Sequence, residues 1–249
     1  MKTLTTLVAI LFINISISQE ININENSNIN NPANQIINKY FEAIGGLKKI
    51  NKISSLYKKF TAKIVDAANI NLDGELKYKT PNLFYSNLSI SQIGEIESLK
   101  YDGENCIIIR NHNNKKIVNK MEGEVLDKKK INFYPFPILA LTKKNTLFTL
   151  LDAKNNLDTA YHKIQINNHK NDTTNLFFDK ITFYLVKKEY IDNGKKEIIE
   201  YEDYKSINGI IFPFREKLTI EIDGNIVQKN INTYTEIIIN QKFNKKEFQ

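Results

Sequence analysis

Between residues 181 and 239, four apolar runs alternate with three Asx-Gly dipeptides. These are Asn193-Gly194, Asn208-Gly209 and Asp223-Gly224, each fifteen positions after the last. An Asx-Gly pair between apolar runs favours a β-hairpin, because both central residues of a type I′ turn need a positive φ. The pattern therefore predicts an up-and-down antiparallel meander. Its runs at 181–186 and 210–214 are apolar on both faces, so we expect this part of the sheet to be covered on both sides or to bow over something.

Strand-like runs also occupy residues 56–110 and 161–178. In the first stretch the runs are broken at Asp73-Gly74, at Gly94 and at Asp102-Gly103. The nine glycines of the chain lie at a helix end or between candidate strands, and none interrupts the interior of a run. That placement favours one long antiparallel sheet over a parallel α/β sheet, whose crossovers would be helical.

Residues 32–44, ahead of the sheet, have the period of an amphipathic helix. Asn31 is its predicted N-cap, and Gly45-Gly46 ends it. A second short helix is predicted at 47–53, just before the first strand. The two helices offer an apolar face that can cover the sheet. The apolar positions of the first helix are Ile36, Ile37, Tyr40, Phe41 and Ile44.

The stretch 119–160 breaks the strand rhythm. Two prolines stand among aromatic residues at 131–141, and they exclude a central strand there. The run 146–153 carries leucines at helical spacing, which predicts a short helix. An apolar, proline-marked excursion of this length in a regular sheet is typical of a lid or a plug.

The first residues have the pattern of a secretory signal. Lys2 supplies the positive start, an apolar run follows, and small residues precede a cleavage site near Ser18. The alternative, a buried N-terminal helix, is disfavoured because a polar stretch follows at once. No cysteine stands near the cleavage site to take a lipid anchor, so we expect an exported, periplasmic protein without a lipid anchor. The chain divides into a signal peptide at 1–18, a flexible Asn-rich spacer at 19–31 and a single domain at 32–249, with a frayed C-terminal end.

The net charge of +7 does not indicate a nucleic-acid partner. Of the 35 basic residues only Arg110 and Arg215 are arginine, and recognition of bases and phosphates favours arginine at chosen positions. A single cysteine, Cys106, excludes an intramolecular disulfide. It stands in an apolar run, so burial as a small apolar residue is favoured over a reactive thiol.

Motifs for catalysis, cofactors and metals are absent from the sequence. His112, His162 and His169 lack the spacing of a metal pair, and there is no nucleophile elbow, zinc motif or phosphate loop. We therefore expect no cofactor, no metal and no enzyme activity. The exception is the carboxylate group Glu200, Glu202 and Asp203, which could serve glycoside hydrolysis. Three lysines nearby favour a solvated strand face instead.

What remains is an excess of apolar and aromatic residues. An ordinary core is one interpretation, and a cavity between the sheet and a helical lid is the other; composition alone leaves both open. An apolar cavity without polar catalytic groups suits alkyl chains, which bind through burial of area, at about 25 cal/mol per Å². The candidate residues for lining the cavity or its lid are Phe84, Phe133, Tyr134, Phe136, Leu147, Phe148, Phe183, Phe212 and Phe214.

Three segments resemble the bacterial LolA-like family of outer-membrane lipoprotein-sorting proteins. The segment 37–56, INKYFEAIGGLKKINKISSL, is similar to the N-terminal helix of that family with its Gly-Gly stop. LKYDGENCIIIR at 99–110, followed by MEGEVL at 121–126, looks like its Tyr-Asp-Gly strand turn before the lid. The segments 177–190 and 200–216 look like its late meander, in which Asn-Gly precedes an Ile-Phe-Pro strand.

The resemblance implies a mainly β fold with a few helices. Its single curved antiparallel sheet would form an unclosed β-barrel, with helices covering the concave face. It also implies a carrier or chaperone that holds acyl chains of lipoproteins or lipids, with only transient membrane contact. Neither arginine can be assigned the role of the arginine that holds the lid in the smaller carriers. Relatives of this fold also act as envelope-stress sensors, so a module that binds envelope proteins is the alternative.

Overall fold

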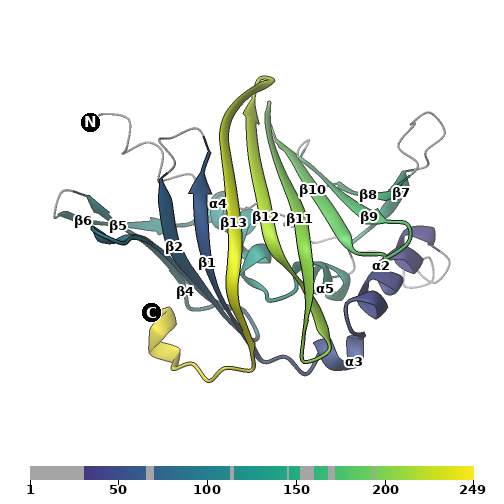
Figure 1. Ribbon diagram of the computed structural model, residues 1–249, viewed down its shortest axis with the longest axis horizontal. Helices are drawn as coiled ribbons and strands as arrows, with labels where there is room; N and C mark the ends of the chain where they lie inside the picture. The colour runs from purple at the N-terminus through teal and green to yellow at the C-terminus, as the bar shows by residue number, and fades with distance from the viewer. Residues whose placement is uncertain are drawn as a thin grey trace. The chain divides into compact units, whose positions relative to one another are not determined.

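The computed structural model describes residues 31–65, 70–112, 115–144, 146–151, 160–167, 172–192 and 194–249 (Figure 1). The predicted signal peptide and all of the predicted spacer except Asn31 lie outside these residues. The described chain forms two compact units. Unit 1 comprises Ile53–Ala140 and Asn230–Gln249, and unit 2 comprises residues 31–52 and Leu141–Lys229.

Unit 1 consists of six sequential strands, the C-terminal part of β13, two short helical pieces and a terminal turn of helix. The strands are β1 (Ser55–Ile64), β2 (Asn71–Lys79), β3 (Leu83–Ile90), β4 (Gly94–Tyr101), β5 (Cys106–His112), β6 (Lys115–Met121) and β13 (Asn225–Ile239). The helical pieces are α4 (Gly123–Lys129), the 3₁₀ helix η2 (Lys130–Phe133) and the 3₁₀ helix η4 (Lys245–Phe248).

Unit 2 begins with two helices and continues in six strands. The helices are α2 (Pro32–Ala43) and α3 (Leu47–Ile50), and α5 (Pro137–Lys143) spans the boundary between the units. The strands are β7 (Thr149–Leu151), β8 (Tyr161–Asn167), β9 (Thr173–Asp179), β10 (Leu185–Asp192), β11 (Lys195–Ile207) and β12 (Ile210–Ile222).

The strands form one antiparallel sheet of thirteen strands, in the order β6-β5-β4-β3-β2-β1-β13-β12-β11-β10-β9-β8-β7. Strands that follow each other in sequence pair with each other, except β6 and β7, and β1 also pairs with β13. Within the described residues the end strands β6 and β7 do not pair with each other, so the sheet is not closed into a barrel. The predicted fold class, a single open antiparallel sheet with a few helices, is confirmed.

The predicted N-terminal helix is confirmed as α2. The Asn31 side chain caps it by accepting a hydrogen bond from the Ala33 backbone N–H at 2.9 Å. Its buried positions include Ile36, Ile37 and Phe41, which have the spacing read from the sequence. After the helix ends, the Ile211 N–H donates to the Ile44 carbonyl at 2.9 Å, so the end of the helix is tied to β12 within unit 2.

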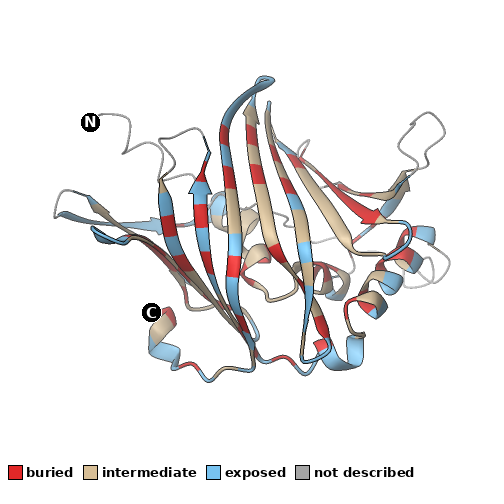
Figure 2. Ribbon diagram, viewed as in Figure 1, coloured by how far each residue is buried: buried red, intermediate tan, exposed pale blue. Residues whose placement is uncertain are grey.

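Two of the three Asx-Gly hairpins are confirmed in full. Asn208 and Gly209 have φ values of 52° and 75°, and Asp223 and Gly224 have 50° and 79°, the positive values that a type I′ turn requires. Gly194 has φ 82° at the third turn, where Asn193 lies outside the described residues. These turns join β10 to β11, β11 to β12 and β12 to β13, and buried positions alternate with less buried ones along β12 (Figure 2).

The prediction of a strand at 181–186 is wrong for its first four residues. The Asp179 carboxylate accepts hydrogen bonds from the backbone N–H of Ile181 and of Thr182, which closes a turn. Phe183 has φ 57°, and Ile181 is 89% exposed. The strand begins only at Leu185, so local side-chain capping outweighs the apolar pattern here.

Two other local predictions are also wrong. The run 146–153 contains β7, an edge strand whose Leu150 is paired with Ile164 of β8, rather than a helix. The C-terminal segment is ordered: Asn244 forms a capping box with Glu247, and Phe248 is fully buried. In both segments, contacts with distant strands decide the conformation, and a local pattern does not reveal them.

Gly74 lies inside β2, whereas the sequence pattern predicted a turn at this position. It pairs with Phe60 of β1, whose ring lies directly over it. A Cβ atom at Gly74 would lie 2.3 Å from Phe60 Cζ, so the glycine makes room for the ring. Phe60 in turn meets the Tyr234 ring edge-on, with centroids 5.8 Å apart.

Replacing Gly74 with alanine is therefore expected to destabilise the protein. Overpacking of this kind costs about 1–3 kcal/mol, measurable as a lower urea midpoint. The double variant with Phe60→Leu should recover part of the loss, because a smaller side chain leaves space for the new methyl group. An unchanged midpoint in the single variant would mean that the Phe60 ring moves aside freely.

Candidate functional site

One side of the sheet in unit 1 is lined by apolar side chains, and we call it the apolar face. Cross-strand pairing places Tyr78, Phe84, Tyr101 and Cys106 in one row on β2 to β5. Directly paired residues of antiparallel strands point to the same side. The row ends at Met121 of β6.

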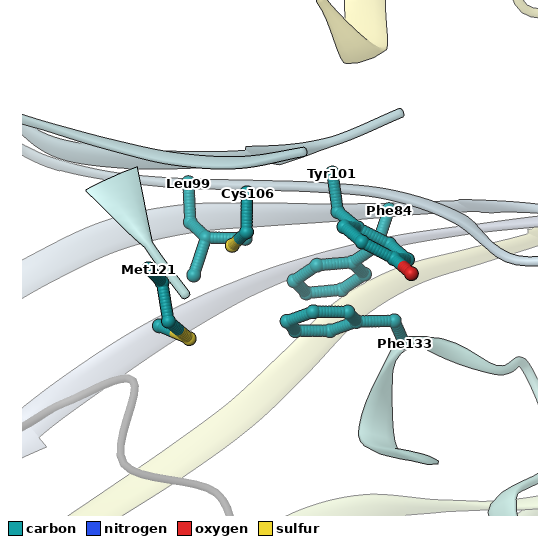
Figure 3. Packing of buried hydrophobic residues seen from close by; sticks show 6 residues of the cluster. All are labelled: Phe84, Leu99, Tyr101, Cys106, Met121 and Phe133. Carbon is teal, nitrogen blue, oxygen red and sulfur yellow. The ribbon is translucent and has the colours of Figure 1, made fainter. Parts of the chain in front are cut away.

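Residues after β6 fold over this row. Phe133 of η2 stacks on Phe84 with ring centroids 4.8 Å apart and an interplanar angle of 9° (Figure 3). Its centroid lies 4.9 Å from that of Tyr101. Leu126 of α4 packs against the same cluster. We call α4 and η2 the cover. The predicted excursion thus supplies an apolar covering element in unit 1, joined to the sheet by aromatic contacts.

The cluster beneath the cover is closely packed. Phe84 and Phe133 are 6% and 4% exposed, so these two predicted site residues contact each other as core. The Tyr101 hydroxyl donates to the Gly103 carbonyl at 2.7 Å, which satisfies the polar end of a buried ring. Tyr134 and Phe136, which follow η2, are half-buried.

The apolar face also carries a buried charge. The Glu97 side chain is 1% exposed and is paired with Arg110 Nε on β5. Burial raises the pKa of Glu97, and the hydrogen bond and charge of Arg110 oppose that rise. The positive charge of Lys129 acts in the same direction as Arg110. Lys129 is the last residue of α4, so the cover and the sheet interact electrostatically as well as through aromatic rings.

Cys106 is part of the same cluster and is buried, as the sequence predicted. Burial raises the pKa of its thiol to about 12. The thiolate is the reactive form of cysteine, so this side chain is suited to packing rather than to chemistry.

The other predicted site residues belong to unit 2. Phe212 and Phe214 lie two residues apart on β12 and are 3% and 8% exposed. Lys205 Nζ lies 4.7 Å from the centre of the Phe214 ring. Phe148 is buried, whereas Leu147 is 49% exposed.

Phe183 lies apart from that pair, at the turn before β10. Its ring stacks on His162 with centroids 5.8 Å apart, and Lys39 Nζ lies 4.8 Å from its centre. On the helix that carries Lys39, Tyr40 packs against Phe178 of β9 with centroids 5.3 Å apart. Helix α2 therefore covers part of the sheet of unit 2 in the region of Phe183.

Unit 2 also contains a half-buried lysine among apolar neighbours. Lys188 of β10 pairs with Leu176 and Ile199, both buried, so its side chain lies on an apolar side of the sheet. Burial lowers its pKa to about 8, and the negative charges of Glu197 and Glu216 oppose the decrease.

Of the three candidate hydrolytic carboxylates on β11, Glu202 and Asp203 form ion pairs and Glu200 is exposed. Glu202 pairs with Lys217 and with Arg215, the latter at 3.7 Å. Asp203 pairs with Lys205 at 2.7 Å. This is the solvated strand face that the neighbouring lysines favoured.

The other two histidines differ in what the structure says of them. His112 ends β5, and His169 lies outside the described residues. In the parts of the chain that the structure describes, no three His, Cys, Asp or Glu side chains gather as metal ligands would.

A polar groove lies on the opposite side of the unit 1 sheet. Its volume is about 410 Å³. Lys77 bridges Glu75 at 3.2 Å and Glu247 of η4 at 3.1 Å along its rim. The lining residues are Lys77, Tyr85, Glu95, Ser98, Lys100, Ile109, Asn111, Lys116 and Glu247.

Sequence reasoning missed the buried Glu97–Arg110 pair, although a signal was present. Glu97 alternates in phase with Leu99 and Tyr101, and Arg110 with Ile108. A carboxylate and a guanidinium in the apolar phase of two adjacent runs predict a buried pair.

The open antiparallel sheet of this chain is similar in fold to two solved structures. A LolA superfamily protein from Nitrosomonas europaea aligns with a TM-score of 0.56 and 14% identity, covering 87% of this chain and 97% of that one. A domain from Vibrio parahaemolyticus, described as an outer-membrane lipoprotein-sorting protein, aligns with a TM-score of 0.58 and 10% identity, covering 86% and 94%. At these identities the likeness establishes the fold, and it confirms at that level the LolA-like resemblance of the sequence.

No protein-family model matches the chain, and no curated protein matches it. Among the described residues, no helix combines the length and the apolar character needed to cross a membrane.

Proposed function

We propose that this protein is a periplasmic, non-enzymatic carrier that holds the acyl chains of lipoproteins or lipids during sorting to the outer membrane. The observation that carries the proposal is the stacking of Phe133 of the cover on Phe84 and Tyr101 of the apolar face. When the cover moves away from the sheet, the apolar face and the apolar side of the cover can both contact an acyl chain that lies between them. The likeness in fold to an outer-membrane lipoprotein-sorting domain supports the same function.

Transport of this kind needs no covalent chemistry. When the cover parts from the sheet, acyl chains replace the rings of the cover as neighbours of the apolar face. Each buried CH₂ group contributes about 0.8 kcal/mol, so roughly ten of them gain about 8 kcal/mol. An aromatic pair contributes only about 0.5–1.5 kcal/mol beyond its buried area. Binding is therefore favourable, and release requires an acceptor that buries the chains better.

The cargo site of unit 1 consists of the aromatic residues of the apolar face and those of the cover and the residues after it. In unit 2 we propose a second apolar lining on the sheet and near β7. The proposed residues are Phe84, Phe133, Tyr134 and Phe136 in unit 1, and Leu147, Phe148, Phe183, Phe212 and Phe214 in unit 2.

Bound cargo provides the direct test. Native mass spectrometry of gently extracted protein should show bound acyl species, and a fluorescent fatty acid should bind and be displaced by them. A protein that carries no acyl species and ignores the probe would overturn the carrier function.

Replacing Phe136 with glutamate is expected to weaken binding of the fluorescent fatty acid by at least about tenfold. The half-buried ring would become a carboxylate that must lose water when the acyl chain covers it. Ile93→Glu is the matched control, because Ile93 is 65% exposed in the turn before β4 and lies outside the proposed site. Equal affinities of both variants and the unmodified protein would exclude Phe136 from the site.

The alternative function is a module that binds an envelope protein. The polar groove of unit 1 favours it, because lysine and glutamate side chains of both charges line an open hollow beside η4. Such a module should capture a defined partner, and the complex should survive removal of lipid. Loss of the partner on delipidation would favour the carrier.

A further inference from the structure

Two asparagines of β13 place amide groups on the apolar face of unit 1. Asn230 pairs with Ile64 of β1, and Asn232 pairs with Ala62, so each amide points to the same side as a buried apolar residue. Asn230 is 1% exposed. Leu72 of β2, which pairs with Ala62 in the row of Asn232, is also buried.

These amides lack hydrogen-bond partners within the described residues. Both the Nδ2 and the Oδ1 atoms of Asn230 are buried without a partner, as is Oδ1 of Asn232. Buried polar atoms in folded proteins nearly always have a hydrogen-bond partner. Without one, the atom loses its hydrogen bonds to water and gains none in return. An apolar residue at either position would avoid that cost, so the amides are explained by a group that reaches them when the site is loaded.

The unpaired atoms define the chemistry of that group. A donor is free at Asn230 Nδ2, and acceptors are free at Asn230 Oδ1 and Asn232 Oδ1. A secondary amide, which has one N–H and one C=O, can pair with a donor and an acceptor of this set. An ester offers only acceptors, and a hydrocarbon offers neither.

The spacing of the two asparagines fits such a group. Residues two apart on a strand are separated by about 6.6 Å. The N–H and C=O of a trans amide point in opposite directions, and with a hydrogen bond of about 2.9 Å at each end the amide spans about 8 Å. Rotation of the two side chains bridges the small difference. Asn230 Nδ2 then donates to the carbonyl while Asn232 Oδ1 accepts from the N–H.

We propose that Asn230 and Asn232 form a subsite for the secondary amide of an N-acylated ligand, beside the apolar region that takes its acyl chain. The subsite rests on the proposed carrier function and narrows its cargo to acyl chains joined through an amide. An N-acylated peptide and an N-acylated lipid share this chemistry.

The first test compares two ligands that differ in one atom. N-ethyl dodecanamide and ethyl dodecanoate have the same chain and shape, but only the amide has an N–H. Displacement of a fluorescent fatty acid from the purified protein should show a preference of about tenfold for the amide, equivalent to about 1.4 kcal/mol. Equal affinities of the two would overturn the subsite and leave the carrier function intact. Failure of both ligands and of the probe to bind would overturn the carrier function itself.

The second test removes the amides. Asn230→Leu and Asn232→Leu keep the side-chain size, so each should erase the preference for N-ethyl dodecanamide while ethyl dodecanoate binds as before. Both variants should also raise the urea midpoint of the empty protein, because an unpaired polar group is replaced by an apolar one. Thr233→Val is the control, since Thr233 is exposed on the same strand and points to the other side. A preference that persists in both asparagine variants would overturn the assignment.

A final comparison identifies the source of the amide. N-dodecanoyl-glycyl-serine represents an acylated peptide, and N-dodecanoyl ethanolamine represents an acylated lipid head. Tighter binding of the first assigns the subsite to acylated peptides, and tighter binding of the second assigns it to lipids. If both bind no better than ethyl dodecanoate, the subsite is overturned.

Discussion

Replacing Arg110 with leucine is expected to lower the free energy of unfolding at neutral pH by about 3 kcal/mol. The variant leaves Glu97, whose side chain is 1% exposed, as a carboxylate without its main partner. Breaking one side of a buried ion pair costs about 3–5 kcal/mol, because the remaining charge has neither water nor a counter-ion. We expect a loss at the lower end of this range, because the Arg110 side chain is 34% exposed and the positive charge of Lys129 still acts on the carboxylate.

The loss of unfolding free energy in Arg110→Leu should become larger as the pH increases. The pKa of Glu97 in the folded protein is raised above the ordinary value of 4.5, so between these two values the folded state binds more protons than the unfolded state. Stability therefore falls as the pH rises through this interval. Without Arg110 the folded pKa rises further and the interval widens. The variant should approach the unmodified protein near about pH 4, where Glu97 is protonated, and diverge from it as the pH increases.

Urea unfolding at several pH values measures this difference, and the chain provides a matched control. Arg215 pairs with Glu202, but these side chains are 43% and 40% exposed. Exposed pairs contribute about 0–1 kcal/mol, so Arg215→Leu should have little effect at any pH. The double variant Glu97→Leu/Arg110→Leu should recover most of the loss, because no buried charge remains. Equal losses for Arg110→Leu and Arg215→Leu would contradict a special role for the buried pair.

The sequence predicted those elements whose signals are local. Asn31 and Gly45-Gly46 bound α2 because capping depends on neighbouring residues alone. Asn208-Gly209 marks its hairpin because the turn itself needs positive φ. The same rule failed at Gly74, where the glycine accommodates the ring of Phe60 on another strand. A glycine can permit the positive φ of a turn or leave space for a side chain on the next strand. Only the partner strand distinguishes these two cases.

The sequence named two members of the aromatic cluster beneath the cover but did not reveal that they contact each other. Phe84 and Phe133 were both candidates, yet 49 residues separate them, and no sequence period relates a sheet residue to a residue of the cover. The amides of β13 had no sequence signal at all. Apolar and polar residues occur in both phases of Asn225–Ile239, so the buried side of that strand could not be assigned. Its pairing with β1 decides the question.

Replacing Phe133 with alanine is expected to detach the cover while most of the sheet remains folded. The ring is 4% exposed and packs on Phe84 and Tyr101, and truncation of a buried phenylalanine costs about 3–5 kcal/mol. Because Phe133 belongs to a segment outside the sheet, this loss should appear chiefly as local opening. Amide hydrogen exchange in α4 and η2 should accelerate about 100-fold or more, which corresponds to about 3 kcal/mol.

Two further variants show whether the cover opens as a separate element, which is the step on which the proposed loading depends. Phe84→Ala removes the partner ring from β3, so it should lower the stability of the sheet as well as that of the cover. Phe243→Ala truncates a ring of similar burial in the cluster with Leu83 and Phe248, and it should leave exchange in α4 and η2 unchanged. A carrier also predicts faster uptake of a fluorescent fatty acid by Phe133→Ala, because the open state is more populated. If Phe133→Ala accelerates exchange equally in β3, β4 and the cover, the two unfold together, and acyl chains cannot enter by parting them.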